Sequence, residues 1–293
     1  MNKTVFIVGP TASGKSGFAV ALAKMLQGEI ISADSMQIYR GLDIGTAKMA
    51  KEEMQGVPHH MLDIVDPDAS FSVQQFQRKA DSIIQDLQKN DRIPIVAGGT
   101  GLYIQSLLFD LDFGRTRPDT KYRAALETLS NTALYEQLKT KNPKEAEKIH
   151  PNNRRRLIRA LEILAAGQML KRDRFDTARK DRHPVIFGLQ IPREILHKRI
   201  EMRVDQMIQQ GLIDECLQTL YPLGRQTQAA AAIGYAETID YLKGLCTQEE
   251  WRRNIIVHTR QYAKRQMTWF LRLPVRWIPY DTDPATIGKE LLL

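Results

Sequence analysis

The sequence has few features of a secreted or membrane protein. Its 293 residues include only two cysteines, Cys216 and Cys246, which are too few for a disulfide framework or a structural zinc site. Its apolar runs, such as residues 4–8 and 93–97, are too short to cross a bilayer, and no signal peptide opens the chain. We therefore expect a globular, cytoplasmic protein.

Acidic residues are scarce in two segments. Residues 151–183 hold ten Lys and Arg against four Asp and Glu, and residues 252–276 hold seven against none. These segments carry the whole net charge of +8, since the rest of the chain is net −5. Localised positive charge suits a surface that binds a polyanion such as nucleic acid, although solvated basic helix faces would give the same counts.

Short apolar runs rich in β-branched residues alternate with helical patterns over most of the chain. This alternation predicts an α/β fold, a P-loop-type and mostly parallel sheet flanked by helices, with ligands at the carboxyl ends of its strands. Strands are expected at residues 4–8, 29–33, 93–97, 185–191 and 275–280, and helices at residues 16–26, 192–220 and 248–271. His59 and His60 are expected in an ordered loop rather than at a metal site, because adjacent histidines usually point in different directions.

Residues 118–183 interrupt the alternation. The stretch is charged, has helical propensity and lacks a convincing strand. We predict an all-helical insertion here, between a first part of the core at residues 1–117 and its completion at residues 184–293.

Residues 9–16 match the phosphate-binding pattern G-x-x-x-x-G-K-[ST] between a strand and a helix. In that pattern backbone N–H groups wrap a diphosphate, the lysine adds a charge and the final hydroxyl can hold magnesium. A structural glycine-rich turn is the alternative, and the pattern does not specify whose phosphates are bound. The predicted diphosphate-binding residues are Gly9, Pro10, Thr11, Ala12, Ser13, Gly14, Lys15 and Ser16, with Ser16 as the Mg2+ ligand.

An acidic residue that closes a second buried strand, as in nucleotide hydrolases, is missing. The strand at residues 93–97 leads instead into Gly98-Gly-Thr-Gly101. Asp34, after the strand at residues 29–33, is the nearest candidate carboxylate, and a capping or loop role is an equally open reading of it. Taken alone, Thr100 is a turn residue, and Arg203 is a surface helix residue beside Arg199, Glu201 and Asp205.

Several segments taken together resemble the bacterial tRNA dimethylallyltransferases, in that family's order and over nearly the whole chain. The resemblance implies that Asp34 is the general base for an adenine amine and that Thr100 lies at the reaction channel. It also implies that Arg203 and Lys15 act on the diphosphate during catalysis. The matching segments are GPTASGKS (9–16), ADSMQIYRGLDIGTAK (33–48), VPHHMLDI (57–64), AGGTGLY (97–103), RRLIRALE (155–162), RVDQMIQQGL (203–212), IGY (233–235) and TRQYAKRQMTWF (259–270).

The resemblance also implies a tRNA-binding surface. In a helix at residues 248–271, Arg253, Arg260 and Lys264 would fall within about 40° of one another and form one basic stripe. Trp269 and Phe270, at helical spacing, are expected in the core. The tRNA-binding positions carried over or placed on this stripe are Asp34, Ser35, Met36, Gln37, Thr100, Arg123, Arg155, Arg156, Arg159, Arg253, Arg260 and Lys264.

The expected reaction is transfer of a dimethylallyl group from dimethylallyl diphosphate to the exocyclic amine of the adenosine 3′ of the anticodon. The expected partners are the anticodon stem-loop of tRNA, dimethylallyl diphosphate and Mg2+, with no membrane and a monomeric chain. An isopentenyltransferase acting on free adenine nucleotides is the alternative that shares most features. A small-metabolite kinase and a non-catalytic RNA-binding P-loop protein are further alternatives.

Overall fold

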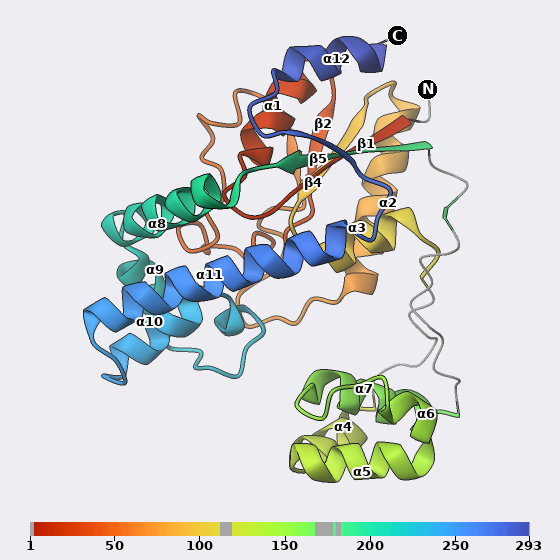
Figure 1. Cartoon of the computed structure of the whole chain (residues 1–293), viewed down its shortest axis with the longest axis vertical. Coiled ribbons are helices and arrows are strands. Elements are labelled where there is room, and N and C mark those ends of the chain that lie inside the picture. The colour runs from red at the N-terminus through yellow and green to blue at the C-terminus, as the bar shows by residue number, and fades with distance from the viewer. Residues whose placement is uncertain (1–2, 112–118, 168–177, 180–182, 293) are drawn as a thin grey trace. The chain divides into compact units, whose positions relative to one another are not determined.

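A parallel sheet of six strands organises the larger of the protein's two units (Figure 1). The computed structural model describes residues 3–111, 119–167, 178–179 and 183–292. The larger unit comprises Met1–Phe109 with Ala178–Leu293, and the smaller one Asp110–Thr177. The strand order is β3-β2-β4-β1-β5-β6, and all neighbouring pairs are parallel, which confirms the predicted fold class. The strands are β1 Lys3–Val8, β2 Glu29–Ser32, β3 His59–His60, β4 Pro94–Gly98, β5 His183–Gln190 and β6 Arg276–Pro279.

The five predicted strands are confirmed within a few residues, and a sixth was missed. His59 and His60 do not lie in a loop but form β3, which pairs with β2 at the edge of the sheet. Two residues are too few for any periodicity to show in the sequence. In the centre of the sheet the last four residues of β1 are fully buried, as expected for a strand covered on both faces.

The strand order places three loops side by side at one edge of the sheet. Val8 is in register with Gly98, and Ser32 with Ala97. The P-loop after β1, the segment beginning at Ala33 after β2 and the glycine-rich turn after β4 are therefore neighbours. Loops at the carboxyl ends of adjacent parallel strands are where α/β proteins place ligands.

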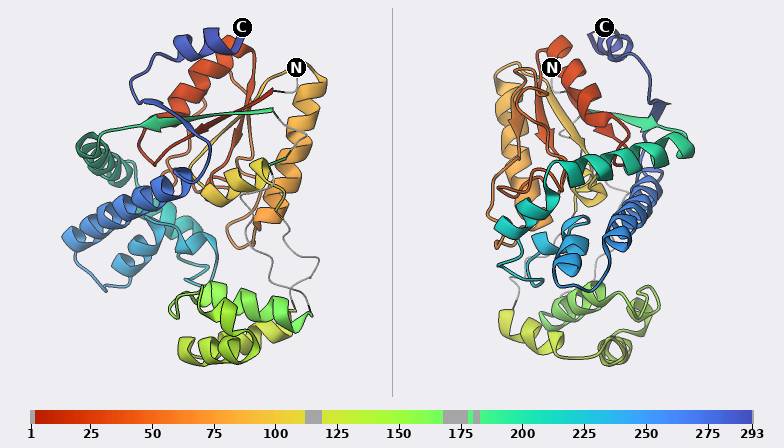
Figure 2. Two further views of the ribbon diagram at one scale, coloured as in Figure 1. Left: turned by 45° about the vertical axis from the view of Figure 1, so that its right-hand side comes forward. Right: turned by 90° about the vertical axis from the view of Figure 1, so that its left-hand side faces the viewer.

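Helices cover both faces of the sheet (Figure 2). On one face α1 (Lys15–Leu26) and α12 (Pro284–Leu292) pack against each other and against side chains of β1 such as Val5 and Ile7. On the other face α2 (Val73–Lys89) packs against α3 (Gly101–Leu108). Within the described part of the chain, no helix has both the length and the apolar character needed to span a membrane.

The segment at residues 192–220, predicted as one helix, is two. Helix α8 (Arg193–Gln209) ends before Gly211, whose φ of 99° cannot continue a helix, and α9 (Leu212–Thr219) follows. Glycine adopts this conformation without strain, so it marks the break. The other predicted long helix is confirmed as α11 (Gln248–Phe270), which packs against α8, α3 and α10 (Tyr235–Leu242).

The described elements of the smaller unit are helices, and most of the predicted insertion at residues 118–183 falls within it. They are α4 (Thr120–Glu127), α5 (Asn131–Lys141), α6 (Pro143–Ala146) and α7 (Arg154–Ala165). Leu134, Leu138, Leu157 and Leu161 are fully buried in its own hydrophobic core. This unit therefore has a core of its own.

Candidate active site

The P-loop adopts a conformation that aims its backbone at an anion. Gly14 has a φ of 93° and Ala12 a φ of 61°, so the chain turns sharply before α1 begins at Lys15. The Nζ of Lys15 donates to the carbonyl oxygen of Pro10 at 3.2 Å, across the loop. The helix N-terminus, its unpaired N–H groups and the ammonium together form an anion-binding site.

Two half-buried cations, Lys15 and Arg203, make this site strongly electropositive. Burial, and then the nearby Arg203 guanidinium, lower the pKa of Lys15 to about 8, while Asp34 opposes the shift. Burial also lowers the pKa of Arg203. Adjacent cations in a desolvated site repel each other until an anion neutralises them. Their placement therefore favours a ligand with several negative oxygens.

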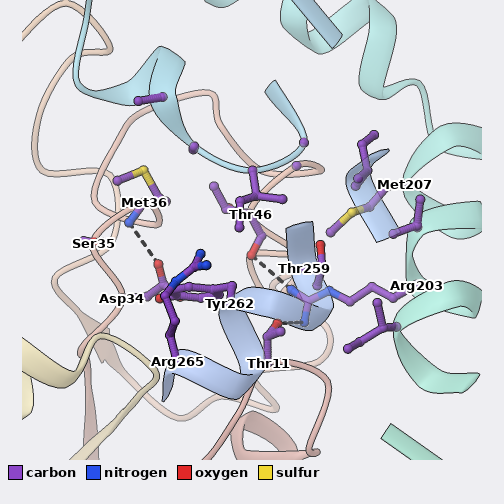
Figure 3. A pocket seen from close by; sticks show the side chains of 18 residues that line it. Thr11, Asp34, Ser35, Met36, Thr46, Arg203, Met207, Thr259, Tyr262 and Arg265 are labelled. Carbon is purple, nitrogen blue, oxygen red and sulfur yellow. Dashed lines mark hydrogen bonds between the residues drawn. The ribbon is translucent and has the colours of Figure 1, made fainter. Parts of the chain in front are cut away.

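Arg203 reaches the P-loop from α8. Its Nη1 donates to the Thr11 hydroxyl at 3.0 Å and its Nη2 to the carbonyl oxygen of Thr46 at 3.2 Å (Figure 3). One turn earlier, the Nη1 of Arg199 donates to the carbonyl oxygen of Ser13 at 3.3 Å. The reading of Arg203 as a surface helix residue is thus wrong, because its guanidinium bonds to Thr11 and Thr46. Its neighbour Asp205 pairs with Arg252 instead.

Asp34 lies directly after β2, beside the glycine-rich turn. Its Oδ1 accepts a hydrogen bond from the backbone N–H of Met36 at 2.9 Å. The Thr100 hydroxyl accepts one from the N–H of Ser35 at 2.9 Å and donates to the Ser35 hydroxyl at 3.3 Å. Gln37 points into the protein, where it contacts Ser32 and the carbonyl oxygens of residues 46 and 47. Thr100 thus fixes the backbone next to the carboxylate.

Asp34, Thr11 and Arg203 line one cavity of about 290 Å³ in the larger unit (Figure 3). Polar groups of Thr11, Asp34 and Arg203 share this cavity with an apolar wall. A pocket with a few convergent polar groups and apolar walls is typical of a small-molecule site. Its residues are Thr11, Asp34, Ser35, Met36, Gly45, Thr46, Ile200, Arg203, Val204, Met207, Ala231, Ala232, Ile233, Gly234, Ile255, Thr259, Tyr262 and Arg265.

A larger hollow of about 1300 Å³ lies along the P-loop and shares Arg203 and Met207 with the first. Lys15 lines it, and the exposed Ser16 brings a hydroxyl oxygen to it. Magnesium prefers oxygen ligands and usually keeps several of them as water or substrate phosphate. The exposed Ser16 hydroxyl, beside the predicted diphosphate-binding loop, fits that donor set.

Gln266 was missed by the sequence reasoning. This buried side chain of α11 accepts from the backbone N–H of Thr11 at 2.8 Å and donates to the carbonyl oxygen of Gly99 at 2.9 Å. A Cβ at Gly99 would lie 2.1 Å from the Gln266 Nε2, so only glycine allows this approach. The sequence did offer one signal: Gln266 is a polar residue on the otherwise apolar face that α11 buries, and a buried polar side chain needs a hydrogen-bond partner.

Of the three residues in the basic stripe expected on α11, two are exposed and one is held in an ion pair with α8. Arg253 and Lys264 are exposed, and Arg253 lies 3.8 Å from the carboxylate of Glu250. Arg260 instead pairs with Glu201 of α8. Of the two aromatic residues expected in the core, Phe270 is fully buried, and the other, at position 269, is partly exposed and packs on Gly101.

The four arginines expected from the resemblance in the smaller unit lie on α4 and α7. Arg155 and Arg156 are exposed. Arg123 and Arg159 both bond to the buried carboxylate of Glu162, at 3.2 and 3.4 Å. Glu162 therefore holds two guanidinium groups on the same side of this helical unit.

The fold and the site define a P-loop α/β protein whose anion-binding loop lies next to a carboxylate and an apolar wall. A family model described as IPP transferase matches residues 37–273. The chain belongs to the IPP transferase family.

Relatives with assigned names agree with this membership. The tRNA dimethylallyltransferase of Anoxybacillus flavithermus is 49% identical, with 96% of this chain and 91% of the relative covered. That of Geobacillus thermodenitrificans is 48% identical, with 99% and 94% covered.

Solved structures are similar as well. The tRNA isopentenylpyrophosphate transferase of Bacillus halodurans is 45% identical with a TM-score of 0.74, covering 99% of this chain and 94% of that one. A eukaryotic dimethylallyltransferase acting on tRNA is 28% identical with a TM-score of 0.79, covering 97% and 75%.

Proposed function

We propose that the protein transfers a dimethylallyl group from dimethylallyl diphosphate to the exocyclic amine of the adenosine 3′ of the anticodon in tRNA, releasing diphosphate. One observation carries the proposal: Asp34, Arg203 and Thr11 of the P-loop line the same cavity, beside apolar side chains. A carboxylate, a diphosphate site and a hydrocarbon pocket are the three elements that prenyl transfer to an amine requires. The names of the relatives point to the same reaction.

The chemistry follows from these groups. The adenine nitrogen forms a bond to C1 of the donor as the C1–O bond breaks, and the electron pair leaves with the diphosphate. The nitrogen loses a proton, which the Asp34 carboxylate accepts. Charge builds up on the diphosphate oxygens, where Lys15, Arg203 and the P-loop amides stabilise it. The fork of Arg203 suits two phosphate oxygens better than a single ammonium would.

Magnesium is the proposed cofactor, and it would neutralise part of the diphosphate charge when bound. Ser16 is the residue that would hold it, together with oxygens of the donor. Ile200, Val204 and Met207 supply apolar surface in the cavity, which suits a short branched hydrocarbon.

The nucleic acid must present its adenosine unstacked, because a base inside a duplex cannot reach a carboxylate in a cavity. An anticodon loop lowers the cost of that extrusion. Exposed cations on α11 and α7, including Arg253, Lys264 and Arg155, would contact its phosphates. We propose a monomeric enzyme that works in the cytoplasm, where it meets tRNA.

The test is a transfer assay. The purified protein is incubated with magnesium, dimethylallyl diphosphate and an unmodified tRNA with adenosines beside its anticodon. The tRNA is then digested, and the masses of its nucleosides are measured by mass spectrometry. Prenylated adenosine in the tRNA, with AMP and ATP unmodified in parallel reactions, supports the proposal. Prenylated free nucleotide would instead identify an enzyme that modifies free adenine nucleotides. ATP consumption without transfer would identify a nucleotide-dependent protein and refute the proposal.

A further inference from the structure

One carboxylate of α9 binds a loop that borders both hollows. Glu215 Oε2 accepts hydrogen bonds from the backbone N–H groups of Asp43 and Ile44, both at 2.8 Å. Its Oε1 accepts from the N–H of Gly45 at 3.0 Å and from the Tyr235 hydroxyl at 2.5 Å. Three successive amides and a phenol thus converge on one side chain. Successive N–H groups of this kind form an anion-binding nest, and here the anion belongs to the protein.

Two glycine-containing motifs interlock at this point. A Cβ at Gly45 would lie 2.4 Å from the ring of Tyr235, which is fully buried. The loop can therefore approach the aromatic ring only because position 45 has no side chain. Gly45 and Tyr235 lie in two segments that match the family, residues 33–48 and 233–235. Neither residue has a role in the proposed reaction. Glu215 is the group that joins them.

The loop held by Glu215 in turn holds the diphosphate-binding arginine. The carbonyl oxygen of Thr46, next to the bound amides, accepts from Arg203 Nη2 at 3.2 Å and from Gln37 Nε2 at 3.3 Å. Asp43 and Ile44 line the hollow along the P-loop, while the next two residues line the cavity of Asp34. A shift of this loop would therefore move one of the two acceptors that orient the Arg203 fork.

We infer that Glu215 is a positioning residue for the diphosphate of the donor. It fixes the loop at residues 43–46 through its backbone amides, and the loop fixes Arg203. Glutamine cannot replace it, because one carboxamide group is a donor and would face N–H groups. This inference rests on the proposed function for its kinetic readout, but binding of inorganic pyrophosphate reports on the same step without any transfer reaction.

The test compares Glu215→Ala and Glu215→Gln with Asp214→Ala, which removes an exposed carboxylate from the same turn of α9. We expect Glu215→Ala to raise the KM for dimethylallyl diphosphate and the Kd for pyrophosphate by about 10-fold to 100-fold, the range for a misplaced positioning group. The KM for tRNA should stay within about twofold of wild type, because the loop held by Glu215 bonds to Arg203 and not to Asp34. Asp214→Ala should match wild type.

Formate gives the discriminating readout. Because formate is a small carboxylate, it should enter the space left in Glu215→Ala, bind the three amides and restore pyrophosphate affinity, whereas chloride at equal ionic strength should not. Glu215→Gln should show no rescue, and wild type with formate reports any competition at the P-loop. Unchanged donor KM and pyrophosphate Kd in Glu215→Ala overturn the inference, as does a loss that formate does not restore in a folded variant.

A milder variant covers the case in which Glu215→Ala does not fold. Tyr235→Phe keeps the ring on Gly45 and removes only the hydroxyl, which bonds to Glu215 and to the Gly45 backbone. We expect a severalfold rise in the pyrophosphate Kd at unchanged tRNA affinity, and an unchanged Kd would overturn the inference. If the wild-type protein binds pyrophosphate but transfers no prenyl group, the proposed function fails while the role of Glu215 remains testable.

Discussion

The pKa of Lys15 predicts how donor capture depends on pH. Burial and Arg203 lower it from 10.5 to about 8 in the free protein. Lys15 is therefore about nine-tenths protonated at pH 7, about half at pH 8 and about one-tenth at pH 9. Only the protonated form of Lys15 attracts the diphosphate, so the contribution of Lys15 to donor affinity is present below pH 8 and is lost as the pH rises through 8. We expect kcat/KM for dimethylallyl diphosphate to fall about tenfold per pH unit above 8.

The assay is a set of initial rates from pH 6.5 to 9.5 with tRNA saturating. The value of kcat should change less than kcat/KM, because the bound diphosphate raises the pKa of Lys15 and keeps it charged. Lys15→Arg is the matched control, since a guanidinium stays protonated throughout this range. Its rates will be lower overall, but its profile above pH 8 should be flat.

Two results would refute the reasoning. A kcat/KM for the donor that does not change between pH 7 and 9.5 would mean that Lys15 is not the titrating group or does not contact the diphosphate. A Lys15→Arg profile with the same alkaline fall would assign the titration to another group or to the tRNA.

Three further predictions concern the same site. Asp34→Asn should lower kcat about 10²-fold to 10⁴-fold with tRNA and donor binding retained, and near wild-type kcat would exclude Asp34 as the base. Arg203→Lys should raise the donor KM about tenfold, because an ammonium cannot reproduce the guanidinium fork, and an unchanged KM would argue against a diphosphate contact. Gly99→Ala should lower the free energy of unfolding by about 1–3 kcal/mol by displacing Gln266. Gly17→Ala, where an added Cβ meets nothing within 4 Å, is the control in thermal unfolding, and equal midpoints would contradict this account.

Local patterns in the sequence predicted much of the core. Apolar periodicity and glycine placement predict the P-loop at residues 9–16, five of the strands and the long helix α11. The same reasoning failed at Gly211, where a single glycine inside an amphipathic pattern ends α8. It also missed β3, which is too short to show alternation.

The polar contacts that complete the site could not be predicted from local sequence patterns. Arg203 was assigned to the diphosphate only through the resemblance, since the residues around it suggested routine surface ion pairs. Gln266 and Glu215 were not singled out at all. Each looks like an ordinary polar residue on a helix, and its partners lie far away in the sequence.

The sequence by itself determined the kind of loop, the parallel sheet and the charge-rich segments, because these depend on neighbours within a few residues. Only the tertiary structure decided which distant segments meet. Arg203 bonds to Thr11 across 192 positions, Glu215 to Asp43 across 172 and Gln266 to Thr11 across 255. Periodicity shows which face of a helix is buried, but not which loop that face meets. The docking of α8, α9 and α11 onto the loops at the edge of the sheet provides that information.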